Sequence, residues 1–280
     1  MSETVGRIQS IWRFPIKSFQ GESIAATSLS AAGIHGDRVL ALRNRETGKI
    51  VSGKHARLGE RVLEFQARYV SEPVAGQPLP RIRARIDGVE VFADDPSAFA
   101  SACSEALQHP VELTAPGASS EVYESDWPDV EDLPLAGASL DLPLPLAEAG
   151  SFADLEPLHL LTTASLAHLS SLAGESRIGT SRFRPGLVLD TGDAGGFPEH
   201  DWSGRTATLG GARLELGGPT PRCLMSTLAQ EGLPRDPSIM RTLIRENRRE
   251  FMGMQMPCLG IYAKVVEPGE IAVGDALTLA

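Results

Sequence analysis

The stretch RIRARIDGVEVF, residues 81–92, decides the class of fold that we expect for this chain of 280 residues. Apolar and polar side chains alternate along residues 81–86 and 90–92, as they do in a strand with one buried face. The dipeptide Asp87-Gly88 between the two segments is one of the strongest short signals for a hairpin turn. We therefore expect an antiparallel pair of strands here.

Further short strands, separated by turns, are expected on both sides of this hairpin. The pattern is met by residues 5–11, 23–29, 39–43, 49–51, 61–68, 187–190, 206–209, 212–216, 259–266 and 271–279. Helices are expected from Pro96 with Asp95 as N-cap, at residues 163–172 with Thr162 as N-cap, and at residues 238–249. Many short strands and few helices favour a barrel or a sandwich, so the expected fold is mainly β with a few helices.

Two domains are expected, residues 1–115 and residues 116–280. The segment at about residues 114–146 is rich in Pro, Gly, Ser and acidic residues, and we expect it to be a long connector on the surface. Residues 1–85 hold 14 Lys and Arg against 7 Asp and Glu, whereas residues 86–176 hold 17 acidic residues and no basic one. A basic N-terminal third could hold an anionic ligand. The uneven charge is explained equally well by a chance composition together with a solvated acidic connector.

The composition argues against several classes of protein. The net charge of −10 argues against general nucleic-acid binding, and no apolar stretch approaches the ~20 residues of a membrane span. Residues 1–10 show no secretory signal, so we expect a cytoplasmic protein with no membrane partner. Three widely spaced cysteines exclude a disulfide scaffold and a Cys-only zinc or iron–sulfur site within the chain.

One near-match to a known motif is rejected. Residues 48–55, GKIVSGKH, resemble a phosphate-binding P-loop, but His55 stands where a magnesium-binding Ser or Thr is required. The segment also lies in a predicted hairpin and is followed by no apolar helix. We therefore expect no nucleotide site there.

Two N-terminal segments offer groups that suit a phosphate. Lys17 and Ser18 follow a strand in the run FPIKS and supply an ammonium and a hydroxyl group. Arg38, in the run GDR, adds a planar guanidinium about twenty residues later. Each residue alone is equally consistent with a solvated side chain beside a strand.

Two C-terminal segments offer an arginine and a cysteine. Arg184, in the run FRPG, precedes a proline that biases its backbone towards an extended conformation and so limits where its side chain can point. Cys223 ends the run GGPTPRC, where Gly and Pro permit tight turns that can present its sulfur, and the adjacent Arg222 favours the thiolate. A lone cysteine is more often a small core residue, but the Gly and Pro setting favours a functional role for Cys223.

Taken in order, FPIKS, GDR, FRPG, PRC with Thr227, and the segment from Gly260 to Asp275 resemble the MOSC family, related to the C-terminal domain of molybdenum cofactor sulfurases. The chain is most similar to the amidoxime-reducing branch. This resemblance implies a MOSC-type β-barrel domain preceded by a smaller β-rich N-terminal domain, which is itself barrel-like. It also implies a molybdenum cofactor, a pterin dithiolene that carries a phosphate.

The resemblance assigns roles by position. Cys223 would be the thiolate ligand of molybdenum, and Asp154 an acidic residue close to the metal. The other residues that would contact the cofactor are Lys17, Ser18, Arg38, Thr162, Ser165, Arg184 and Arg222. A soft thiolate suits molybdenum already bound by sulfur, and Lys and Arg suit phosphate. Helix capping explains Thr162 equally well.

Three positions depart from better-known relatives. Leu155 and Glu156 add bulk and a carboxylate between Asp154 and a proline, where relatives often have one small residue. Gly186 stands where relatives have Asn, so a side-chain amide is lost. These departures put the chemistry on the substrate side in doubt more than the binding of the cofactor.

The resemblance implies a molybdenum-dependent oxidoreductase that reduces N-hydroxylated or N-oxide small molecules. Since the chain has no iron–sulfur or flavin motif, electrons would come from a separate protein of the ferredoxin or flavoprotein type. Asp154 would orient a water molecule or relay a proton. Two alternatives stay open: sulfur transfer through a persulfide on Cys223, and a carrier that holds the cofactor without turnover.

Overall fold

The computed structural model describes residues 2–117, 121–146, 150–230 and 232–280. Most of its regular structure is strand. The strands are β1 Glu3–Arg13, β2 Glu22–Ile24, β3 Ala26–Ser30, β4 Gly33–Ile34, β5 Ala41–Asn44, β6 Gln66–Tyr69, β7 Ile82–Ile86, β8 Val89–Phe92, β9 Val111–Thr114, β10 Glu121–Asp126, β11 Ser139–Leu144, β12 Leu158–Thr162, β13 Leu187–Asp190, β14 Thr206–Leu209, β15 Ala212–Pro221, β16 Arg248–Phe251, β17 Met254–Glu267, β18 Gly269–Ala272 and β19 Ala276–Leu279. The α-helices in these ranges are α1 Gly59–Glu64, α2 Pro96–Leu107, α3 Thr163–Leu172 and α4 Ser238–Glu246. The expected mainly β fold with a few helices is confirmed.

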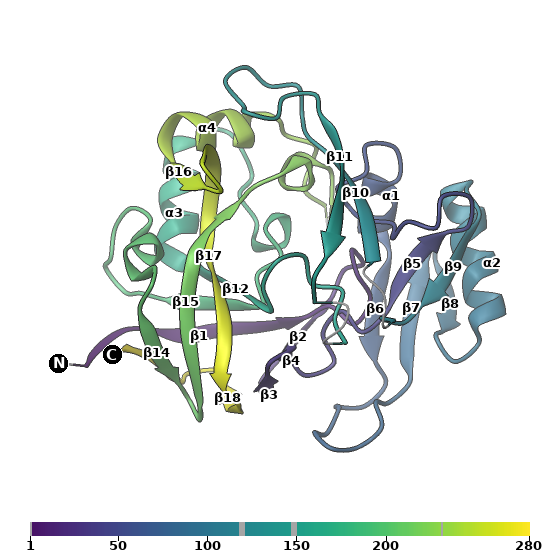
Figure 1. The fold of residues 1–280 in the computed structure, drawn as a ribbon, viewed down its shortest axis with the longest axis horizontal. Coiled ribbons are helices and arrows are strands. Elements are labelled where there is room, and N and C mark those ends of the chain that lie inside the picture. Colours follow the sequence, from purple (N-terminus) through teal and green to yellow (C-terminus); the bar gives the residue numbers. More distant parts are fainter. Residues whose placement is uncertain (1, 118–120, 147–149, 231) are drawn as a thin grey trace.

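Seven strands form a closed barrel, at the left of Figure 1. Their order around the barrel is β12, β13, β1, β19, β14, β15 and β17, and β17 pairs with β12 to complete the circle. The β12–β13 pair is parallel, and the other pairs are antiparallel. Burial alternates along β14, β19 and the first half of β15, whereas β12, β13 and β17 have consecutive buried residues. Aliphatic side chains such as Ile8, Leu160 and Leu214 fill the interior.

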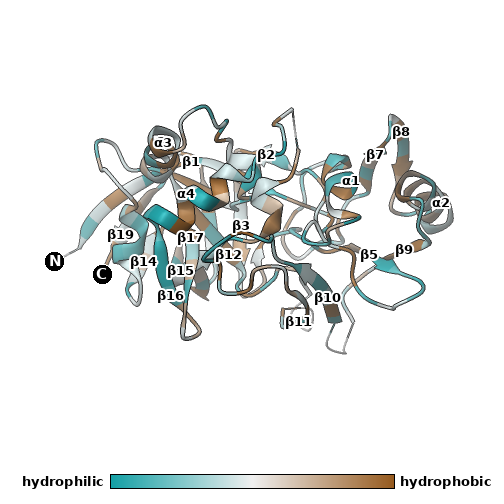
Figure 2. Cartoon of the chain, turned by 90° about the horizontal axis from the view of Figure 1, so that it is seen from above, coloured by the Kyte–Doolittle hydropathy of each residue, from teal (hydrophilic) through white to brown (hydrophobic). Residues whose placement is uncertain are grey.

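The other half of the molecule contains β5 to β9, α1 and α2, and lies at the far right of Figure 1. Its core holds Phe19, Phe65, Phe99 and Cys103, each with no exposed surface. Phe19 packs edge-on against Phe65, with ring centroids 5.3 Å apart. Figure 2, seen from above, shows α2 at one end of the molecule and the barrel strands β14 and β19 at the other.

The hairpin that the sequence predicted around residues 87–88 is present. β7 and β8 pair with Ile86 opposite Val89, and the two turn residues between them have positive φ. Asp95 caps α2 and accepts a hydrogen bond from the Ala98 amide. Thr162 likewise caps α3, which spans the predicted residues.

The segment at residues 114–146 is not only a connector. Residues 121–126 and 139–144 form the antiparallel pair β10–β11, which lies between the barrel and the right-hand half in Figure 1. Every second residue of β10 is buried, and Tyr123 is 1% exposed. Sequence reasoning missed this period of two because the composition of the segment is acidic and turn-like.

Two further expectations differ in detail. Residues 61–68 were expected to be one strand, but they contribute to α1 and then β6. The helix expected at residues 238–249 ends at Glu246, and β16 begins at Arg248. In both cases a turn in the middle of the segment lets each part pack against a different neighbour.

The boundary between domains at residue 115 remains a prediction. The strands do not separate there, because β1 belongs to the barrel and β3 pairs with β18. The described residues include no helix with the length and apolar character needed to cross a membrane.

Candidate functional site

A cleft between the barrel and the N-terminal half gathers most of the residues singled out in the sequence. It contains about 730 Å³ of space outside atoms, open solvent included. The lining residues with polar, charged or thiol side chains are Lys17, Ser18, Arg38, Ser52, Lys54, Asp154, Glu156, His159, Arg184, Thr220, Arg222, Cys223 and Tyr262. Five of these are Lys or Arg and two are acidic, so the cleft is basic within an acidic protein.

Two lysines from different loops, Lys17 and Lys54, form ion pairs with Asp154. Lys17 Nζ lies 2.5 Å from Asp154 Oδ1, and Lys54 Nζ lies 2.9 Å from Oδ2. Lys17 Nζ also donates to the Phe152 carbonyl at 2.8 Å. Both oxygens of the carboxylate are therefore engaged, and two positive charges share one negative charge.

This arrangement sets the charge of all three groups. Burial and the nearby Lys54 lower the pKa of Lys17 to about 8, although Asp154 opposes the change. Burial also disfavours charge on Lys54 and Asp154, but the ion pairs outweigh it, so the pKa of Lys54 is raised and that of Asp154 is lowered. Asp154 thus remains ionised at neutral pH, which does not suit it to donate a proton.

Three lining residues have a left-handed backbone, which is costly for a side chain with Cβ. They are Ser18 with φ 68°, Arg38 with φ 51° and Arg184 with φ 50°. The extended backbone that the sequence predicted for Arg184 is therefore wrong. The other non-glycine residues with positive φ among the described ranges are Asp87, Gln108, Asp132 and Met252, and hairpin turns or a helix end account for most of these. Strain concentrated in one cleft indicates that the fold holds these side chains in place for a function.

The GDR loop is tied to the end of β1. Asp37 Oδ1 accepts from the Phe14 amide at 2.7 Å, and Asp37 Oδ2 pairs with Arg38 Nη1. The Phe14 ring is contacted by the guanidinium groups of Arg38 and Arg184, at 5.0 and 4.1 Å from its centroid. Arg184 Nη2 also donates to the Phe19 carbonyl at 2.8 Å. These contacts bring residues from three distant segments to one wall of the cleft.

Cys223 follows the end of β15 and lines the cleft, although it is only 7% exposed. Cys103 and Cys258 have no exposed surface, and burial raises the pKa of each thiol to about 12. Among the described cysteines, Cys223 alone lines this cleft. The position suits a thiolate that acts as a ligand or nucleophile.

Two buried polar atoms of the cleft lack a hydrogen-bond partner within the described residues. They are Arg222 Nε and Thr220 Oγ1, in residues that are each 4% exposed. Arg222 Nη2 is satisfied by the Phe183 carbonyl at 3.0 Å. Buried polar groups in folded proteins are nearly always paired, so these two atoms point to a partner that binds in the cleft.

Thr162 and Ser165 lie elsewhere. Both hydroxyl groups donate to the buried carboxylate of Glu199, Thr162 Oγ1 at 2.7 Å and Ser165 Oγ at 2.6 Å. The Gly260 amide donates to the same carboxylate at 3.1 Å. Neither residue lines the cleft, so the geometry supports capping and support of Glu199 rather than contact with a ligand.

Sequence reasoning missed Lys54, His159 and Tyr262, which all line the cleft. Lys54 lies in the segment that was rejected as a P-loop. The chain has only four lysines, and the position of Lys54 close to a predicted hairpin was the one sequence feature that could have indicated its role. His159 and Tyr262 carried no local signal. Burial lowers the pKa of His159 well below its usual value, with Arg222 contributing, so its ring is neutral.

The departures noted in the sequence have different settings. Glu156 lines the cleft and forms an ion pair at 3.4 Å with the exposed Lys264. Leu155 is 38% exposed. Gly186 packs closely, since a Cβ there would lie 2.9 Å from Ile34 Cδ1, so a larger residue would require Ile34 to move.

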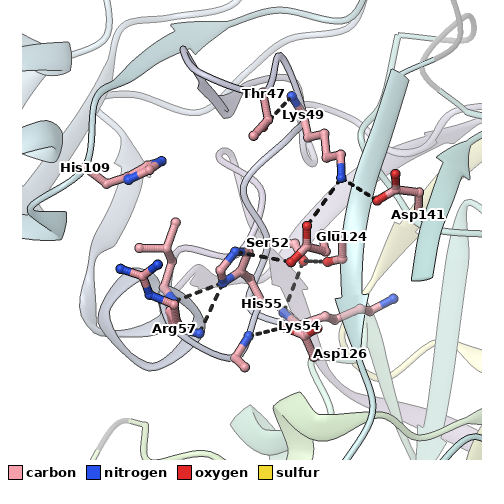
Figure 3. Close-up of polar contacts among 12 residues, drawn as sticks. Thr47, Lys49, Ser52, Lys54, His55, Arg57, His109, Glu124, Asp126 and Asp141 are labelled. Carbon is pink, nitrogen blue, oxygen red and sulfur yellow. Dashed lines mark hydrogen bonds and ion pairs between the residues drawn. The ribbon is translucent and has the colours of Figure 1, made fainter. Parts of the chain in front are cut away.

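A second polar cluster, shown in Figure 3, connects the loop that carries Lys54 and His55 with β10. The imidazole of His55 and the carboxylates of Glu124 and Asp126 approach within 4.8 Å of one another, which resembles a metal site. However, His55 Nδ1 accepts from the amides of Arg57 and Leu58 at 3.1 and 3.3 Å. The ring proton therefore lies on Nε2, facing Glu124, and the cluster is better explained as a structural anchor.

The chain matches two domain families and is similar to several known proteins. Residues 148–278 match the MOSC domain, and residues 5–69 match the MOSC N-terminal beta barrel domain. The chain is 23% identical over 299 residues to mitochondrial amidoxime-reducing component 1 of Mus musculus, covering 99% of this chain and 83% of that protein. It is 24% identical over 300 residues to the protein of the same name in Homo sapiens, covering 99% and 84%. Among solved structures, the YUAD protein from Bacillus subtilis is similar with a TM-score of 0.46 and 12% identity, covering 100% of this chain and 97% of that one.

Proposed function

Because this chain is a MOSC-domain protein that also carries the MOSC N-terminal beta barrel domain, we propose that it binds a molybdenum cofactor in the cleft and reduces N-hydroxylated or N-oxide small molecules. The observation that carries the proposal is that Cys223 and five cationic side chains line one cleft. The names of the relatives, which are amidoxime-reducing components, support reduction of an N–O bond as the reaction.

The residues of the cleft fit such a cofactor. A cysteine thiolate is a soft ligand that suits molybdenum, and the cationic groups suit the phosphate of the pterin. The unpaired Arg222 Nε and Thr220 Oγ1 supply buried donors that the polar atoms of a pterin would satisfy. The fit therefore rests on charge, on ligand type and on unsatisfied hydrogen-bonding groups.

The chain would contribute position and charge. When bound, the cofactor supplies two-electron redox chemistry, which the side chains of this protein lack. Lys17, Arg38 and Lys54 would bind its anionic end, while Cys223 would hold the metal. Asp154, kept ionised by two ammonium groups, would orient a hydrogen-bond donor in the cleft and would not deliver a proton itself.

Reduction of an N-hydroxy group to an amine consumes two electrons and two protons, and the oxygen leaves as water. Cys103 and Cys258 are fully buried, and burial raises the pKa of each thiol. Neither thiol is therefore suited to supply electrons. We therefore propose that a separate redox protein, of the ferredoxin or flavoprotein type, supplies the electrons.

Metal and pterin analysis of freshly purified protein tests this proposal. We expect close to one molybdenum and one pterin per chain, and reduction of an amidoxime such as benzamidoxime with an artificial electron donor. A metal-free protein with a persulfide on Cys223 would point to sulfur transfer instead. A protein loaded with cofactor that reduces no N-hydroxylated compound would point to a carrier, and either result would overturn the proposed activity.

A further inference from the structure

Tyr123 lies beneath both lysines of the cleft. Its ring centroid is 5.1 Å from Lys17 Nζ and 4.7 Å from Lys54 Nζ, within the range of cation–π attraction. Its hydroxyl accepts a hydrogen bond from Lys54 Nζ at 2.9 Å. The side chain is 1% exposed, so these interactions form out of water, where they are stronger.

Tyr123 and Asp154 together fix the two ammonium groups. Asp154 binds each lysine through a different oxygen, and Tyr123 supports both from the interior. Burial raises the pKa of the Tyr123 hydroxyl to about 12, although Lys54 opposes the change, so it stays neutral and accepts from the ammonium. The lysines thus have defined positions before any anion binds.

The same strand also holds the loop that carries Lys54. In β10, the Asp126 amide donates to the Lys54 carbonyl at 2.9 Å, and Asp126 Oδ2 accepts from the Ala56 amide at 2.5 Å. Ser52 Oγ donates to the Glu124 carbonyl at 3.4 Å, and its oxygen accepts from the Lys54 amide at 3.1 Å. Figure 3 shows these contacts running along β10. Residues 121–126 lie outside both segments that match a domain family.

We infer that Tyr123 is a positioning residue for anion binding: its ring and hydroxyl place Lys17 and Lys54 so that the pair binds a phosphate group. The inference rests on the proposed function only in naming that phosphate as part of the cofactor. Tyr123 acts through the lysines, because the hydroxyl is engaged by Lys54.

The test measures binding of inorganic phosphate to the full-length chain, produced in a host that makes no pterin so that the cleft is accessible to the probe. Tyr123→Phe keeps the ring and removes the hydroxyl, and we expect phosphate to bind about 3-fold more weakly. Tyr123→Leu also removes the ring, and we expect about 10-fold weaker binding. Ser104→Ala is the control, since it also removes a hydroxyl group, one that hydrogen-bonds the backbone of Val111 in the N-terminal half and does not line the cleft.

Two further measurements separate positioning from a general structural role. In a Lys54→Met background, Tyr123→Phe should have no additional effect on phosphate affinity, because its partner is gone. The chain has only four lysines, so lysine-selective NMR resolves each of them. Lys17 should titrate near pH 8 in the wild type, and about half a pH unit lower in Tyr123→Leu, with Lys49 and Lys264 unchanged.

Each outcome decides the inference. Equal effects of Tyr123→Phe and Ser104→Ala, or a full effect of Tyr123→Phe without Lys54, would overturn it. Should Tyr123→Leu fail to fold, the Tyr123→Phe series still gives the answer. If protein purified from a host that makes the cofactor lacks molybdenum, while the phosphate measurements show the expected coupling, the proposed function is refuted and this inference stands.

Discussion

Two buried polar centres flank β12, and they differ in how completely their groups are paired. At Glu199, which has no exposed surface, the carboxylate accepts from Thr162, Ser165 and the Gly260 amide. In the cleft, five cationic side chains surround two carboxylates, and Arg222 Nε and Thr220 Oγ1 have no partner within the described residues. The first centre is satisfied by the protein itself, whereas the second has donors and positive charge left over.

The difference separates structural from functional polar groups. A buried polar network that satisfies all its members stabilises one arrangement of the chain. A network with excess charge and unsatisfied donors costs stability unless a ligand completes it. Changes at Glu199 should therefore alter stability, and changes in the cleft should alter binding and activity.

The largest effect is expected for Cys223→Ser. If Cys223 holds the metal, reduction of an amidoxime should fall by about 1,000-fold or more, because the hard hydroxyl is a poor ligand for molybdenum. Molybdenum content and turnover with an artificial donor measure this. Cys103→Ala is the control, since it lies in the core of the N-terminal half and should keep its molybdenum content. Full activity in Cys223→Ser would exclude thiolate ligation.

Glu199→Gln should act on stability. The donors around Glu199 now share two carboxylate oxygens, whereas the side-chain amide of Gln would offer them only one acceptor oxygen. We therefore expect the free energy of unfolding to fall by about 1–3 kcal/mol. Urea denaturation measures the change. The pterin content of the folded protein should stay at the wild-type level, and a selective loss of pterin would show that the two centres are not separate in function.

Lys17→Met should act on binding. Removal of one ammonium group should weaken phosphate about 10-fold, since charged hydrogen bonds contribute about 1.5–3 kcal/mol when desolvated. Calorimetry on the full-length chain measures the affinity. Lys49→Met is a matched control, because Lys49 forms ion pairs with Glu124 and Asp141 near the surface. Equal affinities of the two variants would remove Lys17 from the binding site.

The smallest effect is expected from pH. Lys17 has a pKa of about 8, lowered from that of a free lysine, so it loses its charge as the pH rises through 8. Phosphate affinity should then fall a few-fold between pH 7 and pH 9 relative to Lys17→Met, in which this group does not titrate. The sign is opposite for stability: the unfolded chain binds this proton more tightly than the folded chain does, so the free energy of unfolding should rise as the pH rises above 8. A flat ratio of affinities would show that Lys17 keeps its charge in this range.

Several elements could be predicted because their signals are local. Asp95 and Thr162 cap helices where expected, since a side chain that accepts from an amide three residues on acts over one turn. The strands at residues 187–190 and 206–209 match their predicted bounds. Strand β10 was missed, since its buried face consists of Glu121, Tyr123 and Ser125, and two of these three side chains are polar.

The site could be predicted only in part. Lys17, Arg38, Arg184 and Cys223 were named from short motifs, and they do line one cleft. Lys54 and Tyr123 were not, because their roles depend on contacts between distant parts of the chain. Lys54 pairs with Asp154 across 100 residues, and it donates to the Tyr123 hydroxyl across 69 residues. Thr162 and Ser165 were named because their positions match cofactor-contacting residues of the family. Their hydroxyl groups instead donate to the carboxylate of Glu199, which is 34 or more residues away in the sequence.

By itself, the sequence determined the class of fold, the helix caps, the tight hairpins and the residue types available for an anion and a soft metal. These depend on dihedral preferences, on periodicity and on side-chain chemistry, which act within a few residues. Only the tertiary structure decided that β1 completes a barrel with strands more than 150 residues away, that Lys17 and Lys54 share Asp154, and that Tyr123 supports them. Burial and pairing between distant segments control these features, and no local pattern records them.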